Sequence, residues 1–143
     1  MGLALLFALA MWGTARLLPS LAITLPWHHV LATIFIATGV LFIFVAGAVF
    51  HTVKTTVNPT KPDATESLVV SGVYRLSRNP MYLGALLALV GWVVFLSHPL
   101  PVLFLPGFVA YLNRFQIAPE ERALAGKFGA EYDRYKQAVP RWL

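Results

Sequence analysis

The stretch Gly72-Val-Tyr-Arg-Leu-Ser-Arg-Asn-Pro-Met-Tyr-Leu-Gly84 joins a polar, basic loop to the start of an apolar helix. Gly72 permits a backbone turn that other residues resist. Asn79-Pro80 is typical of a helix start, with Asn as the cap and Pro in the first turn, where its missing N–H costs nothing. The stretch therefore predicts a loop that ends at about Asn79 and a helix that begins directly after it.

The composition excludes an ordinary soluble protein. The chain has 143 residues, a formal net charge of +5, 58% hydrophobic and only 12% charged residues, and no cysteine. Residues 17–53 and 81–113 carry no Asp, Glu, Lys or Arg at all. Such stretches indicate a bilayer, since about 20 apolar residues span its hydrocarbon core. The absence of cysteine excludes disulfides, a cysteine nucleophile and a thiolate metal site, and leaves the redox compartment open.

Apolar runs and breakers predict the order of elements. Residues 1–53 should form two transmembrane helices, residues 54–80 a polar loop, residues 81–118 a short helical hairpin broken at Ser97-His-Pro-Leu-Pro101, and residues 119–143 an amphipathic helical tail. Gly126 and Gly129 should split that tail into two short helices. The fold class we predict is an all-α integral membrane protein with four transmembrane helices and an amphipathic C-terminal helical segment, in a single domain.

The placement of charge predicts the topology. Four of the eleven basic residues lie between Lys54 and Arg78, and six lie from Arg114 onward. Because Lys and Arg mark the cytoplasmic side, the loop 54–80 and the C-terminus should both be cytoplasmic in a multi-pass protein. The basic residues flank apolar helices, so we do not expect nucleic acid as a partner. Arg16 does not fit this pattern, although its long side chain can snorkel to the membrane surface.

The flanks of the central stretch carry a family resemblance. Before it stands Glu66-Ser-Leu-Val-Val-Ser-Gly-Val-Tyr74, and after it stand Glu120-Glu121, Phe128-Gly-Ala-Glu-Tyr-Asp-Arg-Tyr135 and Val139-Pro-Arg-Trp142. In this order the segments resemble the isoprenylcysteine carboxyl methyltransferase family, and the related short phospholipid methyltransferases look similar. The resemblance covers roughly residues 66–142. One departure is that the family usually has Arg-His-Pro where this chain has Arg78-Asn79-Pro80.

The resemblance implies an integral membrane methyltransferase that uses S-adenosylmethionine and transfers a methyl group to a lipophilic acceptor, a carboxylate or an amine of a lipid-like molecule that enters from the bilayer. It implies contacts to the cofactor from Glu66, Ser67, Leu68, Val69, Tyr74, Arg78, Asn79, Pro80, Met81, Tyr82, Glu120 and Glu121, and attraction of an acidic acceptor by Arg114. Membrane lipids are further expected partners. The resemblance identifies no catalytic residue, and we expect no metal.

Several of these residues also have a purely structural explanation. Asn79 could be no more than a helix cap. Glu120 and Glu121 could be no more than favourable negative charge near a helix start, although we favour Glu121 over Glu120 as the cofactor contact. The four histidines, His28, His29, His51 and His98, have no metal-ligand spacing with nearby carboxylates and are expected to pack or to lie at the interface.

Two alternative functions stay open on the sequence. Membrane sterol reductases have a similar Arg-His-Pro-x-Tyr stretch, so a nicotinamide-nucleotide-dependent membrane reductase is the first alternative. A non-catalytic membrane subunit whose loop binds lipid headgroups is the second. The identity of the acceptor, the membrane concerned and the oligomeric state are not predicted.

Overall fold

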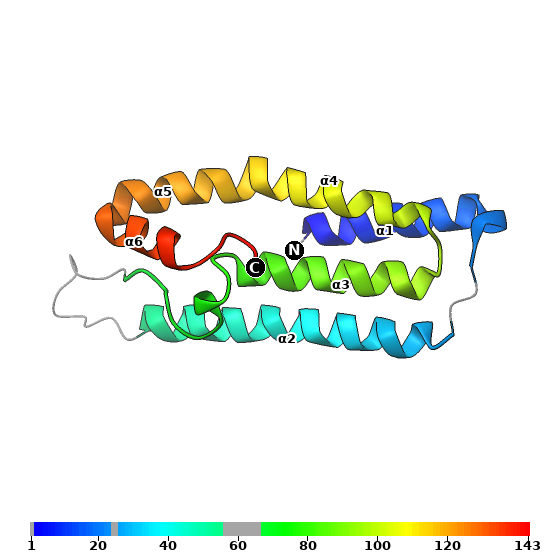
Figure 1. Ribbon diagram of the computed structural model, residues 1–143, viewed down its shortest axis with the longest axis horizontal. Helices are drawn as coiled ribbons and strands as arrows, with labels where there is room; N and C mark the ends of the chain where they lie inside the picture. The colour runs from blue at the N-terminus through cyan, green and yellow to red at the C-terminus, as the bar shows by residue number, and fades with distance from the viewer. Residues whose placement is uncertain (1, 24–25, 56–66) are drawn as a thin grey trace.

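The computed structural model describes residues 2–23, 26–55 and 67–143 as four helical rods that lie side by side (Figure 1). The first three rods are α1 (Gly2–Leu17), α2 (His28–Thr55) and α3 (Pro80–Leu96). The fourth rod is continuous and comprises η4 (Leu100–Leu103), α4 (Phe104–Tyr111), the π-helical turn η5 (Leu112–Ile117) and α5 (Ala118–Phe128). A short helix, α6 (Ala130–Ala138), and two 3₁₀ turns, η1 (Pro19–Leu21) and η3 (Gly72–Arg75), complete the described elements.

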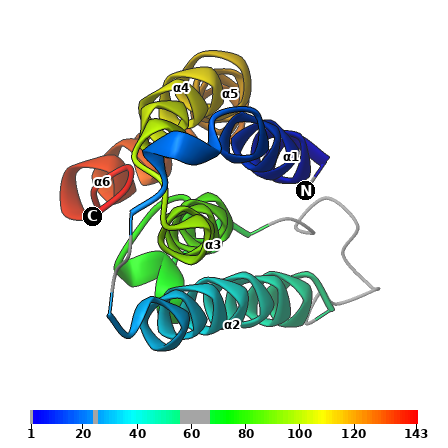
Figure 2. The ribbon, with the colours of Figure 1, turned by 90° about the vertical axis from the view of Figure 1, so that its right-hand side faces the viewer.

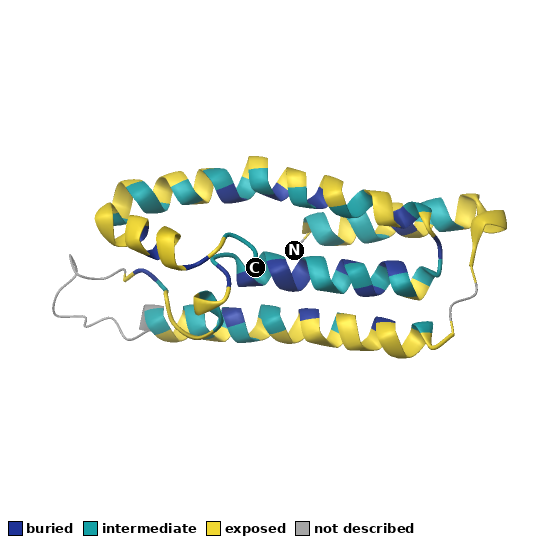
Figure 3. Ribbon diagram, in the orientation of Figure 1, coloured by how far each residue is buried: buried dark blue, intermediate teal, exposed yellow. Residues whose placement is uncertain are grey.

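Two of the rods are long and apolar enough to cross a membrane, over His28–Val53 and Leu100–Phe128. α1 and α3 are shorter apolar helices. The outer surface of the bundle is itself apolar, because α2 and the fourth rod are largely exposed along their length (Figure 3) and bear exposed Phe44, Leu41 and Phe115. A bundle with this surface is that of a membrane protein, as the composition predicts.

Helix α3 lies at the centre, between α2 on one side and α1 with α4 on the other (Figure 2). Its contact with α2 is made backbone to backbone. A Cβ atom added to Gly84 would lie 2.5 Å from the carbonyl oxygen of Gly39, and one added to Gly91 would lie 2.9 Å from that of Ala32. Small residues at facing positions are what allows helices in membranes to approach closely.

The turn between α3 and the fourth rod falls where the two prolines predict it. Ser97 adopts a left-handed conformation with φ +47° directly after α3. His98 is buried, and its Nε2 lies 2.9 Å from the carbonyl oxygen of Leu18 at the end of α1. His98 therefore holds α1 against this turn, which is the packing role expected from the sequence.

The fourth rod is longer than the sequence suggested, because it does not end at about residue 118, as the predicted hairpin does, but continues to Phe128. In a regular helix the ring of Pro119 would clash with the carbonyl group four residues earlier. The wider turn η5 lies just before Pro119 and accommodates it. The rod then ends at Gly129, with φ +50°, and α6 follows, so the predicted break occurs at Gly129, whereas Gly126 remains inside α5.

Candidate functional site

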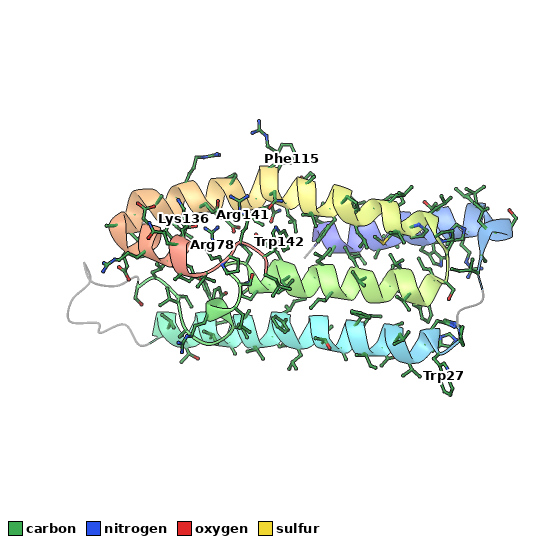
Figure 4. All side chains as sticks on the ribbon, viewed as in Figure 1. Trp27, Arg78, Phe115, Lys136, Arg141 and Trp142 are labelled. Carbon is green, nitrogen blue, oxygen red and sulfur yellow. The ribbon has the colours of Figure 1, made fainter. Side chains whose placement is uncertain are left out.

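The polar residues of the central loop and of the C-terminal tail meet at one end of the bundle. There the loop 67–79 lies against α5, α6 and residues 139–142. Figure 4 shows Arg78, Arg141 and Trp142 gathered between the fourth rod and the start of α3, while Phe115 points away from the bundle and Trp27 lies at its opposite end. The backbone N–H of Arg78 donates to the carbonyl of Pro140 at 3.0 Å, which fixes the loop to the tail. Two segments about 60 residues apart in sequence therefore build one site.

A cavity of about 200 Å³ opens among these segments. Its lining residues come from α2, the loop, α5 and α6: Phe50, Ser67, Leu68, Val69, Tyr74, Arg78, Leu124, Lys127, Phe128 and Tyr135. Five of them are residues that the sequence assigned to cofactor binding. The volume is below the roughly 300–1,000 Å³ of complete small-molecule sites, so the described walls have room for only part of a ligand of that size. Glu66, which precedes Ser67, lies outside the described residues.

Arg78 belongs both to the cavity and to the polar network beside it. Its Nη1 lies 3.0 Å from Oε1 of Glu121 and donates to the hydroxyl of Tyr132 at 3.3 Å. Its Nε is buried and has no hydrogen-bond partner within the described part of the chain. An unsatisfied buried donor on a charged group costs about 1–3 kcal/mol or more. Arg78 is therefore suited to receive an anionic ligand group, such as a carboxylate.

Glu121 is shared between two arginines. Besides its contact with Arg78, it accepts hydrogen bonds from Arg141, from Nε to Oε1 at 3.0 Å and from Nη2 to Oε2 at 2.5 Å. This two-pronged geometry matches the planar fork of arginine to both carboxylate oxygens. In this structure Glu121 holds Arg78 and Arg141 in place and does not line the cavity.

Asn79 connects the helix start to the tail. It occupies the cap position of α3, but its side chain makes no capping hydrogen bond. Instead its Nδ2 donates to the carbonyl of Arg141 at 3.0 Å, and its backbone N–H donates to Oγ of Ser77 at 3.1 Å. The Ser77 hydroxyl, which is fully buried, donates to the same Arg141 carbonyl at 3.3 Å. The capping role expected for the Asn79 side chain is thus replaced by a role in fixing the tail.

The two tyrosines that the sequence assigned to the cofactor lie at different places. The hydroxyl of Tyr82, in the first turn of α3, donates to Oε1 of Glu120 at 2.6 Å, so these two predicted residues contact each other outside the cavity. Tyr74 lines the cavity, and its backbone carbonyl accepts a hydrogen bond from the hydroxyl of Tyr135 at 2.6 Å. Burial raises the pKa of Tyr74, and the negative charge of Glu120 raises it further. Burial likewise raises the pKa of Tyr135 to about 12, so both phenols are protonated at neutral pH.

The remaining predicted residues lie around this site or beyond it. The predicted residues that do not line the cavity are Asn79, Pro80, Met81, Tyr82, Glu120 and Glu121, of which Pro80 is buried. Arg114, expected to attract the acceptor, lies exposed in η5.

Sequence reasoning assigned no role to Arg141 and Trp142, although both belong to the network. The indole Nε1 of Trp142 donates to Oδ1 of Asn113 in η5 at 3.1 Å. Sequence reasoning also assigned no role to five residues of the cavity wall, Phe50, Leu124, Lys127, Phe128 and Tyr135, or to Tyr132 beside Arg78. The segment Val139-Pro-Arg-Trp142 was part of the family pattern, and an arginine within it was the available signal.

Comparisons with known proteins point to one family. The family model described as phospholipid methyltransferase matches residues 27–131. A 63-residue segment is 51% identical to an uncharacterized protein of Haemophilus influenzae and covers 44% of this chain and all of that protein.

Longer enzymes match as well. The protein-S-isoprenylcysteine O-methyltransferases of Saccharomyces cerevisiae and Homo sapiens are each 37% identical, over 83 and 100 residues, which are 56% and 70% of this chain. The matched part makes up 34% of each of these two enzymes. No solved structure matches the chain significantly.

Proposed function

Because the chain belongs to the phospholipid methyltransferase family, we propose that it is an integral membrane methyltransferase that transfers a methyl group from S-adenosylmethionine to a lipophilic acceptor. The observation that carries the proposal is the position of Arg78. It lines the cavity beside four other residues of the predicted cofactor site, and its buried Nε is without a partner in the described part of the chain.

The cavity fits the amino-acid end of that cofactor. Arg78 would hold its carboxylate, since a guanidinium with a free N–H is the preferred partner of such a group. The rings of Tyr74, Phe50 and Phe128 provide apolar faces in the same wall. When bound, the cofactor supplies a methyl group on a positively charged sulfur. The chain's own contribution is to bind, to orient and to exclude water, which favours an in-line displacement between charged partners.

The neighbouring residues would keep Arg78 oriented. Glu121 and Tyr132 fix its Nη1, and Arg141 fixes Glu121 from the other side. Asn79 and Ser77 bind the tail that carries Arg141. In this proposal Glu121 acts on the cofactor through Arg78, and the hydrogen bond between Tyr82 and Glu120 joins α3 to α5.

The membrane arrangement we propose has four transmembrane helices, formed by α1, α2, α3 and the fourth rod. The central loop and the tail would lie on the cytoplasmic side, and α6 with the end of α5 would lie at the membrane surface. The direct contact between Arg78 and Pro140 supports a common side for loop and tail. A polar cofactor would then enter from the cytoplasm and a lipophilic acceptor from the bilayer, with Arg114 in η5 near its polar group.

Binding to purified protein tests the proposal. In lipid nanodiscs, S-adenosylmethionine and its demethylated product should bind, and Arg78→Gln should weaken binding by about tenfold or more, since a charged hydrogen bond contributes about 1.5–3 kcal/mol. Arg75→Gln is the matched control, because Arg75 is an exposed arginine of the same loop that does not line the cavity. Arg78→Lys keeps the charge but lacks the planar guanidinium, so it separates the contribution of charge from that of geometry.

Two outcomes would contradict the proposal. One is that neither form of the cofactor binds to the folded wild-type protein. The other is that a nicotinamide nucleotide competes for the same site. The acceptor class is then identified by incubation with isotopically labelled cofactor and mass spectrometry of the labelled lipids and small molecules.

A further inference from the structure

A groove runs along the side of the bundle where α1 crosses α3. It consists of three adjoining cavities of about 280, 440 and 290 Å³, all of which include Trp92 in their lining. We call it the α1 groove and define it by Ala4, Leu5, Ala8, Trp12, Arg16 and Trp92. None of these residues lines the candidate cofactor cavity.

The α1 groove is apolar along its length and basic at one end. Ala4, Leu5 and Ala8 line its inner part with Ile36 of α2, whereas Arg16 and Trp12 line its outer part. Arg16 is exposed, and its guanidinium carbon lies 5.4 Å from the centre of the Trp12 ring. The positive charge of Arg16 therefore lies next to the apolar part of the α1 groove.

Arg16 is isolated from the acidic side chains that the structure describes. It is the only charged residue between residues 1 and 53. The described carboxylate side chains, those of Glu120, Glu121, Glu131 and Asp133, lie in α5 and α6, at the opposite end of the bundle (Figure 1). The guanidinium of Arg16 is therefore expected to pair with an anion from outside the protein. In a membrane the abundant anion is a lipid phosphate.

The dimensions of the α1 groove match one lipid chain. From Arg16 to Ala4 the groove follows twelve residues of α1, which is roughly 18 Å at 1.5 Å per residue. One leaflet contributes about half of the roughly 30 Å hydrocarbon core. An acyl chain of one leaflet whose headgroup lies at the level of Arg16 is therefore about as long as the groove.

The walls of the groove are held by specific contacts. The indole Nε1 of Trp92 donates to the backbone carbonyl of Ala8 at 3.0 Å, which fixes the distance between α1 and α3. The Trp92 ring is also stacked on Phe95, with centroids 5.2 Å apart and planes at 13°. The small side chain of Ala8 leaves the α1 groove open beside this hydrogen bond.

We propose that the α1 groove binds one anionic phospholipid of the leaflet opposite the candidate cofactor site, with its phosphate at Arg16 and one acyl chain along Ala8 and Trp92. The proposal needs only a membrane protein and is independent of methyl transfer. A protein that binds no cofactor at all would still be expected to retain this lipid.

Charge at Arg16 is tested by native mass spectrometry of detergent-purified protein with added phosphatidylglycerol or phosphatidylcholine. The wild-type protein should retain phosphatidylglycerol in preference to phosphatidylcholine. Arg16→Gln should reduce retention of phosphatidylglycerol about fivefold, the effect of roughly 1 kcal/mol for one basic residue at an anionic surface. Arg134→Gln, which removes an exposed arginine from α6, should leave retention unchanged.

The apolar part of the α1 groove is tested by a substitution that fills it. Ala8→Phe adds a ring inside the groove and should abolish retention of both lipids. Ala10→Phe adds the same ring on the exposed side of α1, outside the groove, and should behave like the wild type.

Equal retention of the two phospholipids by the wild-type protein, or no difference between Arg16→Gln and Arg134→Gln, would overturn the assignment. So would loss of lipid in Ala8→Phe and Ala10→Phe alike. If a neutral isoprenoid alcohol displaces phosphatidylglycerol from the wild type and from Arg16→Gln with equal efficiency, the groove is a site for neutral chains and the proposal is wrong.

Discussion

The side-chain amide of Asn79 donates a hydrogen bond to the backbone carbonyl of Arg141, 62 residues further along the chain, at 3.0 Å. An amide at this position therefore ties the beginning of α3 to the last residues of the protein. The family that the sequence resembles usually has a histidine at this position. In this chain the asparagine side chain binds the tail instead.

We expect Asn79→Ala to loosen the tail, because one hydrogen bond of about 0.5–1.5 kcal/mol is lost. Asn79→Asp should loosen it more, since a carboxylate cannot donate to the Arg141 carbonyl and would be repelled by it. Hydrogen exchange of residues 139–143 measures the effect. Thr33→Ala is the control, since its hydroxyl bonds only to His29 within α2. Equal exchange in Asn79→Asp and the wild type would contradict the expectation.

Glu121→Gln should destabilise the protein by about 1–3 kcal/mol, because the buried guanidinium of Arg78 loses its charged partner and Arg141 loses a two-pronged one. Equilibrium unfolding in mixed detergent micelles gives the free energy. Glu131→Gln is the matched control, since Glu131 is exposed on α6. An equal effect of the two substitutions would show that the ion pairs of Glu121 with Arg78 and Arg141 contribute nothing to stability.

Gly39→Ala should lower the thermal midpoint, because the added Cβ would lie 2.7 Å from the backbone nitrogen of Ala88 and force α2 and α3 apart. Overpacking of this kind costs about 1–3 kcal/mol. Gly47→Ala, in the same helix, meets nothing within 4 Å and should be neutral or stabilising by up to about 1 kcal/mol. Thermal unfolding in one detergent compares them, and a neutral Gly39→Ala would rule out tight packing of the two helices.

The phenol of Tyr135 should contribute stability that is lost at high pH. Its pKa is raised from the ordinary value of 10.0 to about 12, chiefly by burial, so the folded state binds this proton more tightly than the unfolded state. The contribution is complete below pH 10 and disappears as the pH rises through about 12.

Spectrophotometric titration of tyrosinate measures this group. Several tyrosines should ionise late in the wild-type protein, and one fewer should do so in Tyr135→Phe. The variant should also lose the hydrogen bond to the Tyr74 carbonyl and show a shallower loss of stability between pH 10 and 12. An unchanged titration curve in Tyr135→Phe would refute this assignment.

Local signals predicted most of the helical framework. Uncharged apolar runs marked the four rods, the prolines around His98 marked the hairpin turn, and Gly129 marked the break before α6. The continuation of the fourth rod through Pro119 could not be read in the same way. It depends on a π turn, which has no signature in the spacing of apolar residues.

The candidate site was predicted in part for a similar reason. The loop residues 67–78 form a continuous pattern, and five of them, Ser67, Leu68, Val69, Tyr74 and Arg78, line a cavity. The partner of Glu121 was missed, because Arg141 is 20 residues away and the two meet only after Gly129 reverses the chain. Contacts of this kind are set by tertiary folding and not by periodicity.

The π turn at Leu112–Ile117 also sets the rotational phase of everything that follows it in the fourth rod. Its bonds span five residues instead of four, so it takes up about one residue more than an α turn, and each residue corresponds to roughly 100° around the axis. Deleting one residue here would swing Glu120 and Glu121 away from Tyr82 and Arg78 while leaving their chemistry intact. A homologue that is one residue shorter just before the glutamate pair should therefore have an α turn where this chain has the π turn. A sequence alignment should allow a one-residue gap at this point.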